Sequence, residues 1–364
     1  MSNPGRRSAE PAARIAQRPR LGIVGPLVGR HPGHVTTQGE ILGDFLEADG
    51  YNLVRASSLL NRYARLLDIL WTVLSRRKDL DVLLIQTYGG PSFVVEDAAS
   101  LLGRWLDMRV VFHLRGGAMP DFLSRHARWG RRVLKRAQIL VVPSDYLART
   151  LRLYGFEPRV VPNVVDVASY PFRLRGRLRP QLLWMRTFHP IYHPEMAVRV
   201  LARVRAVVPE ARLVMAGEEK GLGESTRRFA AELGVADAIR FTGFLDPSAK
   251  RREGSGADVF LNTNRIDNQP VSVIEACAMG LPVVATAVGG VPDLLSDGET
   301  ALLVPDGDDA AMADAVLELL RNQVLAARLS ENARRLAEQF APEPVLSAWG
   351  GLLDELAGRK SGEA

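Results

Sequence analysis

The residues best suited to chemistry are two carboxylates, Asp267 and Glu275, eight positions apart in the stretch NRIDNQPVSVIEACAMGLPVVAT at 264–286. Pro270 is typical of the first turn of a helix, and Gly280 is typical of the residue that ends one. The pattern predicts the first carboxylate on a loop and the second about one turn into a helix. Two acids beside a helix N-terminus could hold one polar ligand between them.

The same stretch allows a structural interpretation. Ser272 and Glu275 form the S-x-x-E pattern of a capping box, in which the glutamate binds a backbone amide at the start of its own helix. Cys277 follows two residues later and is the only cysteine of the chain. Because no histidine lies near it in sequence, we expect Cys277 to pack a helix against a sheet rather than to act as a nucleophile.

The stretch resembles the E-x7-E region of retaining glycosyltransferases of family 4, which have the GT-B fold, with Asp267 in place of the first glutamate. The resemblance implies that Glu275 binds the ribose hydroxyls of a nucleoside diphosphate sugar. It implies that Asp267 binds the hydroxyls of the transferred sugar, although aspartate is one methylene shorter than glutamate. It further implies metal-independent transfer with retention, and no cofactor beyond the donor substrate itself.

Negative charge that builds on a departing diphosphate calls for a cationic side chain and for free backbone amides at a helix N-terminus. Val271 and Ser272 offer such amides in the first turn of the predicted helix. By the resemblance, Arg186, which follows a predicted strand, is the phosphate-binding arginine.

The family usually places a lysine five residues after this arginine, where the present chain has Ile191. Tyr192 or His193 could supply a hydrogen bond to the diphosphate instead. His189 and His193 have the i, i+4 spacing of a zinc pair, but the prolines that follow each of them break the helix that would align them. We therefore expect no metal site.

Five more residues occupy positions that match the family. His113 ends a predicted strand and would lie near the donor sugar, and Gly33 would let the first loop approach a ligand. Gly217, Gly243 and Phe244 end two strands and would line the nucleotide, with Phe244 near the base. Each glycine could also do no more than form a turn.

A chain of 364 residues exceeds what one hydrophobic core usually supports, so two domains are expected. Short apolar runs alternate with helical patterns in both halves, which predicts an α/β protein with two Rossmann-like domains. The resemblance implies that these domains face each other across a cleft, as in GT-B enzymes. The expected parts are a disordered leader at 1–20, an acceptor-side domain at 21–170, a linker at 171–180, a nucleotide-sugar domain at 181–340, and a C-terminal helix at 341–364 that in the family crosses back to the first domain.

Six strands are expected in each half, separated by helices. They lie at 21–25, 52–55, 82–86, 110–114, 139–143 and 159–162 in the first half, and at 181–185, 212–216, 239–242, 259–262, 282–286 and 301–304 in the second.

The net charge of +6 is concentrated in the first 170 residues, which hold 24 Lys and Arg against 15 Asp and Glu. Within that half, Phe122 to Ala137 reads as one helix with aromatic residues on one side and basic residues on another. Such a helix could lie on an anionic membrane, or it could pack on its own sheet with a solvated basic face. Nucleic acid is not an expected partner, because no series of aromatic residues is interleaved with the basic ones.

The leader has no apolar core, no run of 18 apolar residues occurs, and a single cysteine suits a reducing compartment. We therefore expect a cytoplasmic protein, with the inner face of the membrane as an option. The predicted function is retaining transfer of a sugar from a nucleoside diphosphate sugar to an acceptor hydroxyl, which could be lipid-linked, in polysaccharide or glycolipid biosynthesis. A non-catalytic subunit of the same fold, a sugar-nucleotide epimerase and a membrane-binding module are the alternatives.

Overall fold

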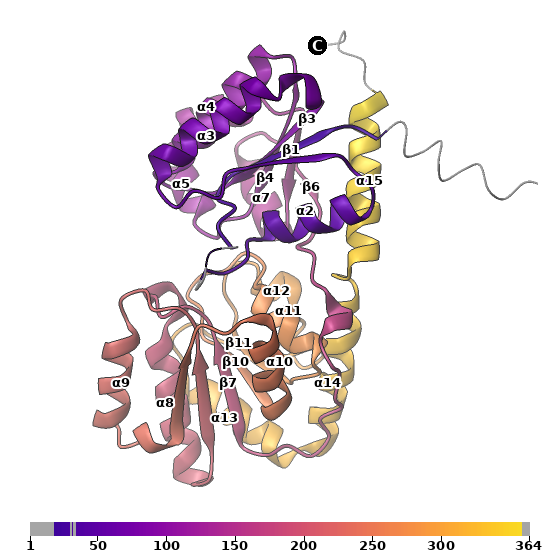
Figure 1. Cartoon of the computed structure of the whole chain (residues 1–364). Helices are drawn as coiled ribbons and strands as arrows, with labels where there is room; N and C mark the ends of the chain where they lie inside the picture. The colour runs from indigo at the N-terminus through magenta and orange to yellow at the C-terminus, as the bar shows by residue number, and fades with distance from the viewer. Residues whose placement is uncertain (1–17, 30, 32–33, 359–364) are drawn as a thin grey trace, which may run out of the picture. The chain divides into compact units, whose positions relative to one another are not determined.

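The computed structural model describes residues 18–29, 31 and 34–358, which form two compact units, each built around one parallel sheet (Figure 1). Unit 1 contains the described residues up to 143, then 148–161 and 343–358, and unit 2 contains 144–147 and 162–342. Gly33 and most of the expected leader lie outside the described residues.

Unit 1 contains a parallel sheet of six strands in the order β2-β1-β3-β4-β5-β6. The strands are β1 (Leu21–Val24), β2 (Leu53–Ala56), β3 (Val82–Thr87), β4 (Arg109–Leu114), β5 (Ile139–Val142) and β6 (Arg159–Val160). All six lie within a few residues of their predicted positions. The apolar runs of β1, β3 and β5 are fully buried in the sheet, as is typical of continuous apolar strands in an α/β protein, whereas the edge strands β2 and β6 are more exposed.

Helices cover both faces of this sheet. They are α2 (Gln38–Ala48), α3 (Arg62–Ser75), α4 (Phe93–Trp105), α5 (Met119–Arg125), α6 (Ala127–Leu134), α7 (Asp145–Leu153) and α15 (Pro342–Gly358). Right-handed crossovers put α3, α4 and α6 on one face, where Figure 1 draws α3 and α4 side by side. On the other face, Trp349 of α15 packs against His113 of β4 with ring centroids 5.0 Å apart.

Unit 2 contains the second six-stranded parallel sheet, in the order β12-β11-β10-β7-β8-β9. Its strands are β7 (Gln181–Met185), β8 (Arg212–Ala216), β9 (Ile239–Gly243), β10 (Val259–Asn262), β11 (Val283–Thr286) and β12 (Leu302–Val304). The predicted strands of the second half are thus confirmed as well. The fold class is α/β with two Rossmann-like units.

Two hydrophobic cores flank the sheet of unit 2. The main helices are α8 (Pro194–Val207), α9 (Gly223–Glu232), α10 (Pro247–Gly256), α11 (Val271–Ala278), α12 (Val291–Leu294), α13 (Asp309–Arg321) and α14 (Gln323–Glu338). Trp184 and Met196 belong to the core that includes α8 and α13, and Phe260 and Cys277 belong to the core that includes α11. Because α11 is buried between the sheet and α14, its position relative to the strand ends is fixed.

The segment predicted as a linker lies inside unit 2 instead, and the chain passes from unit 1 to unit 2 after Val161. Two arginines of the segment bind the buried carboxylate of Asp258. Arg179 donates a hydrogen bond to it from Nε at 2.9 Å, and Arg173 forms an ion pair with it. Arg175 is itself 1% exposed. The composition of residues 171–180 is typical of a solvent-exposed linker. The structure instead holds this segment in unit 2 by charge pairing with Asp258 and by burial of Arg175.

The single helix expected from Phe122 to Ala137 is also corrected. The structure divides the region into α5 and α6 at His126, whose backbone (φ −127°, ψ 37°) is not helical. Phe122 and Val133 are buried against unit 1, as in the packed-helix interpretation. In the described part of the chain, no helix is both long and apolar enough to cross a membrane.

Candidate functional site

Four neighbouring strands of unit 2 end side by side, and the predicted site residues follow them. The order β10-β7-β8-β9 brings together the strand ends that lead to Asp267, Arg186, Gly217 and Gly243. Ligands of α/β proteins bind at the carboxyl ends of the strands. Unit 2 alone therefore assembles most of the predicted site.

Arg186 comes directly after β7, and 15% of its side chain is exposed. Its guanidinium forms an ion pair with Asp267 and donates a hydrogen bond of 3.4 Å to the hydroxyl of Ser272. It also lies over the ring of Tyr192, 4.1 Å from the centroid. The Nε atom is buried without a hydrogen-bond partner among the described residues. Arg186 thus holds a fixed positive charge at the first turn of α11.

Asp267 is held in place by its own loop. Its carboxylate accepts hydrogen bonds from the side-chain amide of Asn264 at 2.6 Å and from the backbone amide of Asn268 at 2.8 Å. The backbone amide of Gly290 donates to the Asp267 carbonyl at 2.9 Å. A Cβ atom at Gly289, where φ is +55°, would lie 2.1 Å from that carbonyl oxygen. A Cβ atom at Gly290 would lie 2.0 Å from the carbonyl oxygen of Asn268, so both glycines are needed to position this carboxylate.

Glu275 lies in the second turn of α11 and is 6% exposed. Its carboxylate accepts a hydrogen bond of 2.8 Å from the Tyr170 hydroxyl and bonds of 2.9 and 3.1 Å from the Lys250 ammonium group. Burial, together with the charge of Glu275, raises the pKa of Tyr170, so its hydroxyl keeps its proton and remains a donor. Among the residues that the structure describes, Oε2 accepts only from Lys250, so it keeps lone-pair capacity for a ligand hydroxyl.

The capping-box interpretation of Glu275 is wrong. The N-cap residue of α11 is Pro270, which makes no side-chain cap hydrogen bond, and the Glu275 carboxylate binds Tyr170 and Lys250 instead. Burial raises the pKa of the Cys277 thiol to about 12, so it stays protonated at neutral pH and does not act as a nucleophile.

Sequence analysis missed both partners of Glu275. Lys250 lies on α10 and Tyr170 lies before β7, 25 and 105 positions away from the glutamate. The rarity of lysine could have drawn attention to Lys250, because the chain has only five lysines among its 47 basic residues. No spacing rule points to Tyr170.

Gly217 directly follows β8 and Gly243 is the last residue of β9, and these strands come next in the sheet after β7, which leads to Arg186. The Gly217 amide donates to the Gly243 carbonyl at 2.8 Å. A Cβ atom at Gly217, where φ is +152°, would lie 1.7 Å from the Arg186 carbonyl oxygen, so only glycine permits this approach. Phe244 follows with 38% of its surface exposed, and Val271 is the first residue of α11.

A second cationic group stands at the position of the missing lysine. The backbone amide of Arg265 donates to the Ile191 carbonyl at 2.8 Å, and its guanidinium lies 3.2 Å from Nε2 of His193. Arg199 reaches the same nitrogen at 3.1 Å. Burial and these two charges lower the pKa of His193, so the ring is neutral. Since Nε2 accepts from both arginines, we assign the ring proton to Nδ1, which has no partner among the described residues.

His113 belongs to unit 1 and is not part of the group in unit 2. It is 1% exposed, and its Nδ1 accepts a 3.0 Å hydrogen bond from Arg115, whose Nε donates to Gln86 at 2.7 Å. Burial and the charge of Arg115 lower the pKa of His113 well below its usual range. Its Nε2 has no partner among the described residues, so a neutral ring with a free nitrogen lies near the carboxyl end of β4.

Glu96 is a buried acid of unit 1 that the sequence analysis did not single out. One oxygen accepts from the Tyr88 amide at 3.1 Å, and the other has no partner in the described part of the chain. Burial raises the pKa of Glu96 to about 8, against the nearby charge of Arg65.

We expect Glu96 to make the stability of the protein depend on pH. A carboxyl group has a pKa of about 4.3 in the unfolded chain, so between that value and about 8 the folded state binds more protons. The free energy of unfolding should therefore fall as pH rises through this window. Urea unfolding at several pH values should show a weaker fall for Glu96→Gln than for the wild type; equal slopes would contradict the assignment.

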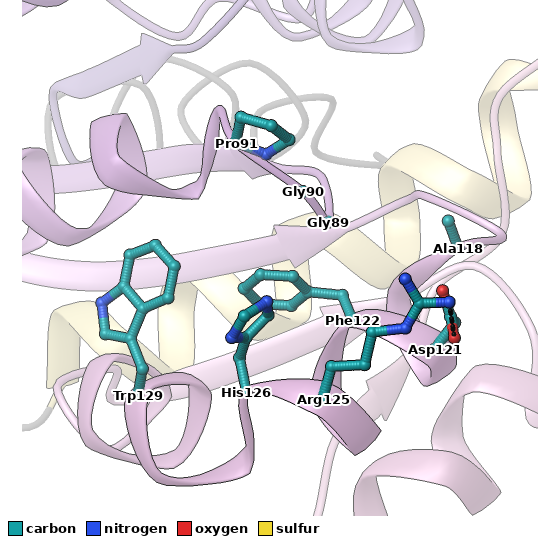
Figure 2. A pocket seen from close by; sticks show the side chains of 9 residues that line it. All are labelled: Gly89, Gly90, Pro91, Ala118, Asp121, Phe122, Arg125, His126 and Trp129. Carbon is teal, nitrogen blue, oxygen red and sulfur yellow. Dashed lines mark ion pairs between the residues drawn. The ribbon is translucent and has the colours of Figure 1, made fainter.

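Unit 1 also contains a cavity of about 320 Å³, between the loop after β3 and the helices α5 and α6 (Figure 2). Phe122, His126 and Trp129 present aromatic rings to it, and the ion pair between Arg125 and Asp121 (3.0 Å) lies at one end. Its remaining lining residues are Gly89, Gly90, Pro91 and Ala118.

Comparison with known proteins gives the same family for both halves of the chain. Residues 31–169 match the family described as Glycosyltransferase Family 4, and residues 179–322 match Glycosyl transferases group 1. The chain belongs to the family 4 glycosyltransferases. The expectation drawn from the stretch around Asp267 and Glu275 is thus confirmed at the level of the family.

Curated relatives are similar over part of their length. The chain is 32% identical to a D-inositol 3-phosphate glycosyltransferase of Acidothermus cellulolyticus over 52% of this chain and 49% of the relative. It is 31% identical to a phosphatidyl-myo-inositol mannosyltransferase of Mycobacterium leprae over 55% of this chain and 53% of the relative. The family 4 chain therefore spans about half the length of the curated relatives it matches.

The fold is also that of solved GT-B structures. Anabaena HepE, solved in complex with UDP and glucose, superimposes with a TM-score of 0.75 at 16% identity, over 93% of this chain and all of that one. At this identity the similarity establishes the fold of the family 4 chain and nothing further.

Proposed function

We propose that the protein is a retaining glycosyltransferase that moves a sugar from a nucleoside diphosphate sugar to an acceptor hydroxyl. The observation that carries the proposal is the convergence of Arg186, the first turn of α11 and two carboxylates at the strand ends of unit 2. The names of the relatives and the UDP bound in HepE support the reaction class and the donor class.

Each group has a role in this proposal. Arg186 and the amides of Val271 and Ser272 bind the diphosphate, where negative charge grows as the sugar departs. Oε2 of Glu275 accepts from a ribose hydroxyl, and Asp267 accepts from hydroxyls of the sugar. Arg265 supplies the second positive charge that the family obtains from lysine, with the neutral His193 as a donor through Nδ1.

The reaction needs no protein nucleophile in this arrangement. The bond between the anomeric carbon and the diphosphate oxygen breaks, and the acceptor oxygen bonds to that carbon on the same face. The acceptor proton passes to the departing diphosphate oxygen. We propose that Arg186 and the helix amides replace a metal ion in stabilising this leaving group.

We place the acceptor on unit 1, where the aromatic cavity suits an acceptor with an apolar part. His113, with its free ring nitrogen, is proposed to contact the donor sugar or the acceptor. A lipid-linked acceptor and a place at the inner face of the cytoplasmic membrane, in polysaccharide or glycolipid biosynthesis, complete the proposal.

Calorimetry with UDP and GDP, followed by product analysis with a panel of nucleotide sugars and hydroxyl acceptors, tests the proposal. We expect one nucleoside diphosphate to bind and one donor to yield a glycoside with the anomeric configuration of that donor. Absence of nucleotide binding would indicate a non-catalytic subunit. Conversion of the donor sugar without an acceptor would indicate an epimerase.

A further inference from the structure

The outer face of α3 and α4 in unit 1 carries an unusual concentration of exposed apolar side chains. Among the residues that the structure describes, nine of the nineteen exposed large apolar side chains fall between residues 59 and 105, about an eighth of the chain. The name α3–α4 face is used below for the seven that lie on the two helices: Tyr63, Leu67, Trp71, Leu74, Val94, Leu101 and Trp105.

These side chains form one stripe on each helix. On α3, Tyr63, Leu67 and Trp71 follow one another at i, i+4 spacing, opposite the buried Ile69 and Val73. Trp71 is 70% exposed. The stripe therefore faces away from the sheet and is not part of the core.

On α4, Val94, Leu101 and Trp105 form the corresponding stripe, opposite the buried Ala99 and Gly103. Trp105 is 74% exposed. Figure 1 draws the two helices side by side on the outer face of unit 1, so the two stripes are neighbours. Exposed apolar patches of this kind mark interaction sites.

Basic residues border the α3–α4 face. Exposed basic side chains are Arg62 at the start of α3, Arg76, Arg77 and Lys78 just after it, and Arg104 beside Trp105. On α6, in the same layer, Arg128, Arg131, Arg132 and Lys135 are exposed as well. Two of the neighbouring acids are already paired: Asp79 with Arg76 at 3.5 Å, and Asp97 with Arg136 at 2.6 Å.

We propose that the α3–α4 face docks on an anionic lipid surface, and that Arg128, Arg131 and Arg132 of α6 attract the anionic headgroups at its border. Tryptophan and tyrosine favour the membrane interface, and arginine and lysine beside them favour anionic headgroups. A second copy of the chain is a less suitable occupant, because a symmetric dimer would place the same basic borders against each other.

This assignment differs from a membrane helix at Phe122–Ala137. There Phe122 is 6% exposed, and the half-buried Trp129 donates from its indole nitrogen to Asp97 at 2.6 Å. Phe122 and Trp129 of that segment are thus turned inward, and most of its exposed residues are basic. The segment contributes charge, while α3 and α4 contribute the apolar contact.

Sedimentation with vesicles of phosphatidylcholine, with or without phosphatidylglycerol, tests the proposal without donor or acceptor and so independently of transfer activity. The wild type should bind the mixed vesicles, and Trp71→Ser/Trp105→Ser should bind them at least roughly tenfold more weakly. Val207→Ser/Val324→Ser, which changes exposed apolar residues of unit 2, is the matched control and should bind like the wild type. Neutralising Arg128, Arg131 and Arg132 should reduce the preference for phosphatidylglycerol.

Tryptophan emission gives a second measurement. The chain has five tryptophans, and Trp184 and Trp349 are buried. Trp129 is half-buried and its indole nitrogen is bonded to Asp97. A blue shift on adding mixed vesicles should therefore arise mainly from Trp71 and Trp105 and be largely lost in their double variant. Equal vesicle binding by wild type and double variant would overturn the proposal. The proposal would also be overturned if the wild type formed a dimer and did not bind vesicles, while the double variant was monomeric.

Discussion

Arg186→Ala should lower kcat/KM for sugar transfer about 100- to 1,000-fold, the usual loss when one charge-stabilising donor is removed from an active site. Without ligand the guanidinium is held by Asp267, Ser272 and the ring of Tyr192, so it already lies at the first turn of α11, where charge develops on the proposed diphosphate. Steady-state kinetics with the donor identified from the panel would measure the effect.

Two variants serve as controls for Arg186→Ala. Arg186→Lys keeps the charge but loses the planar fork, so we expect an intermediate activity. Arg203→Ala removes an arginine whose side chain is 55% exposed and which pairs with Asp309, and it should leave transfer unchanged. Activity of Arg186→Ala within about threefold of the wild type would exclude Arg186 from diphosphate stabilisation, since a donor to developing charge contributes far more.

Glu275→Gln should weaken binding of the nucleoside diphosphate roughly 100-fold. A hydrogen bond to a charged group contributes about 1.5 to 3 kcal/mol, and the carboxylate is proposed to accept from the ribose. Calorimetry on the free protein with the preferred nucleotide would measure the affinity. Tyr170→Phe removes one of the two donors to Oε1 and leaves Oε2 unchanged, so its loss of nucleotide affinity should be much smaller.

The design must separate a lost ligand contact from a damaged fold, because Glu275→Gln leaves the Lys250 ammonium group without its carboxylate. Glu275→Gln/Lys250→Met removes the unpaired charge. Stability should recover in this double variant, as urea unfolding would show, while nucleotide affinity should stay low. Recovery of affinity together with stability would show that Glu275 has a structural role only.

The sheets could be predicted because their strands are short apolar runs bounded by Gly, Pro and polar residues, a pattern that depends on local sequence. The loop, helix and strand around Asp267 could also be predicted, because the spacing of Pro270, Gly280 and the two acids indicates where each of them begins and ends. Arg186 was singled out through the resemblance to the family, at the position directly after a predicted strand.

What escaped the sequence analysis depends on contacts between distant residues. Lys250 and Tyr170 meet Glu275 only after the sheet is formed, and Arg173 and Arg179 of the predicted linker pair with the buried Asp258 from distant positions in the sequence. The α3–α4 face was missed for a different reason. Its apolar residues have the spacing of an ordinary amphipathic helix, and only the structure shows that two such stripes face outward.

The ion pair between Arg186 and Asp267 has a consequence for product inhibition. In the proposed reaction a complete donor replaces both partners at once, since its diphosphate takes Arg186 and its sugar hydroxyls satisfy Asp267. A spent nucleoside diphosphate takes Arg186 but leaves the Asp267 carboxylate, 13% exposed, with only its neutral donors Asn264 and Asn268 and without a charged partner, which costs free energy. The pair therefore favours the donor over its own leaving group, and re-forming it helps to expel the product after each turnover.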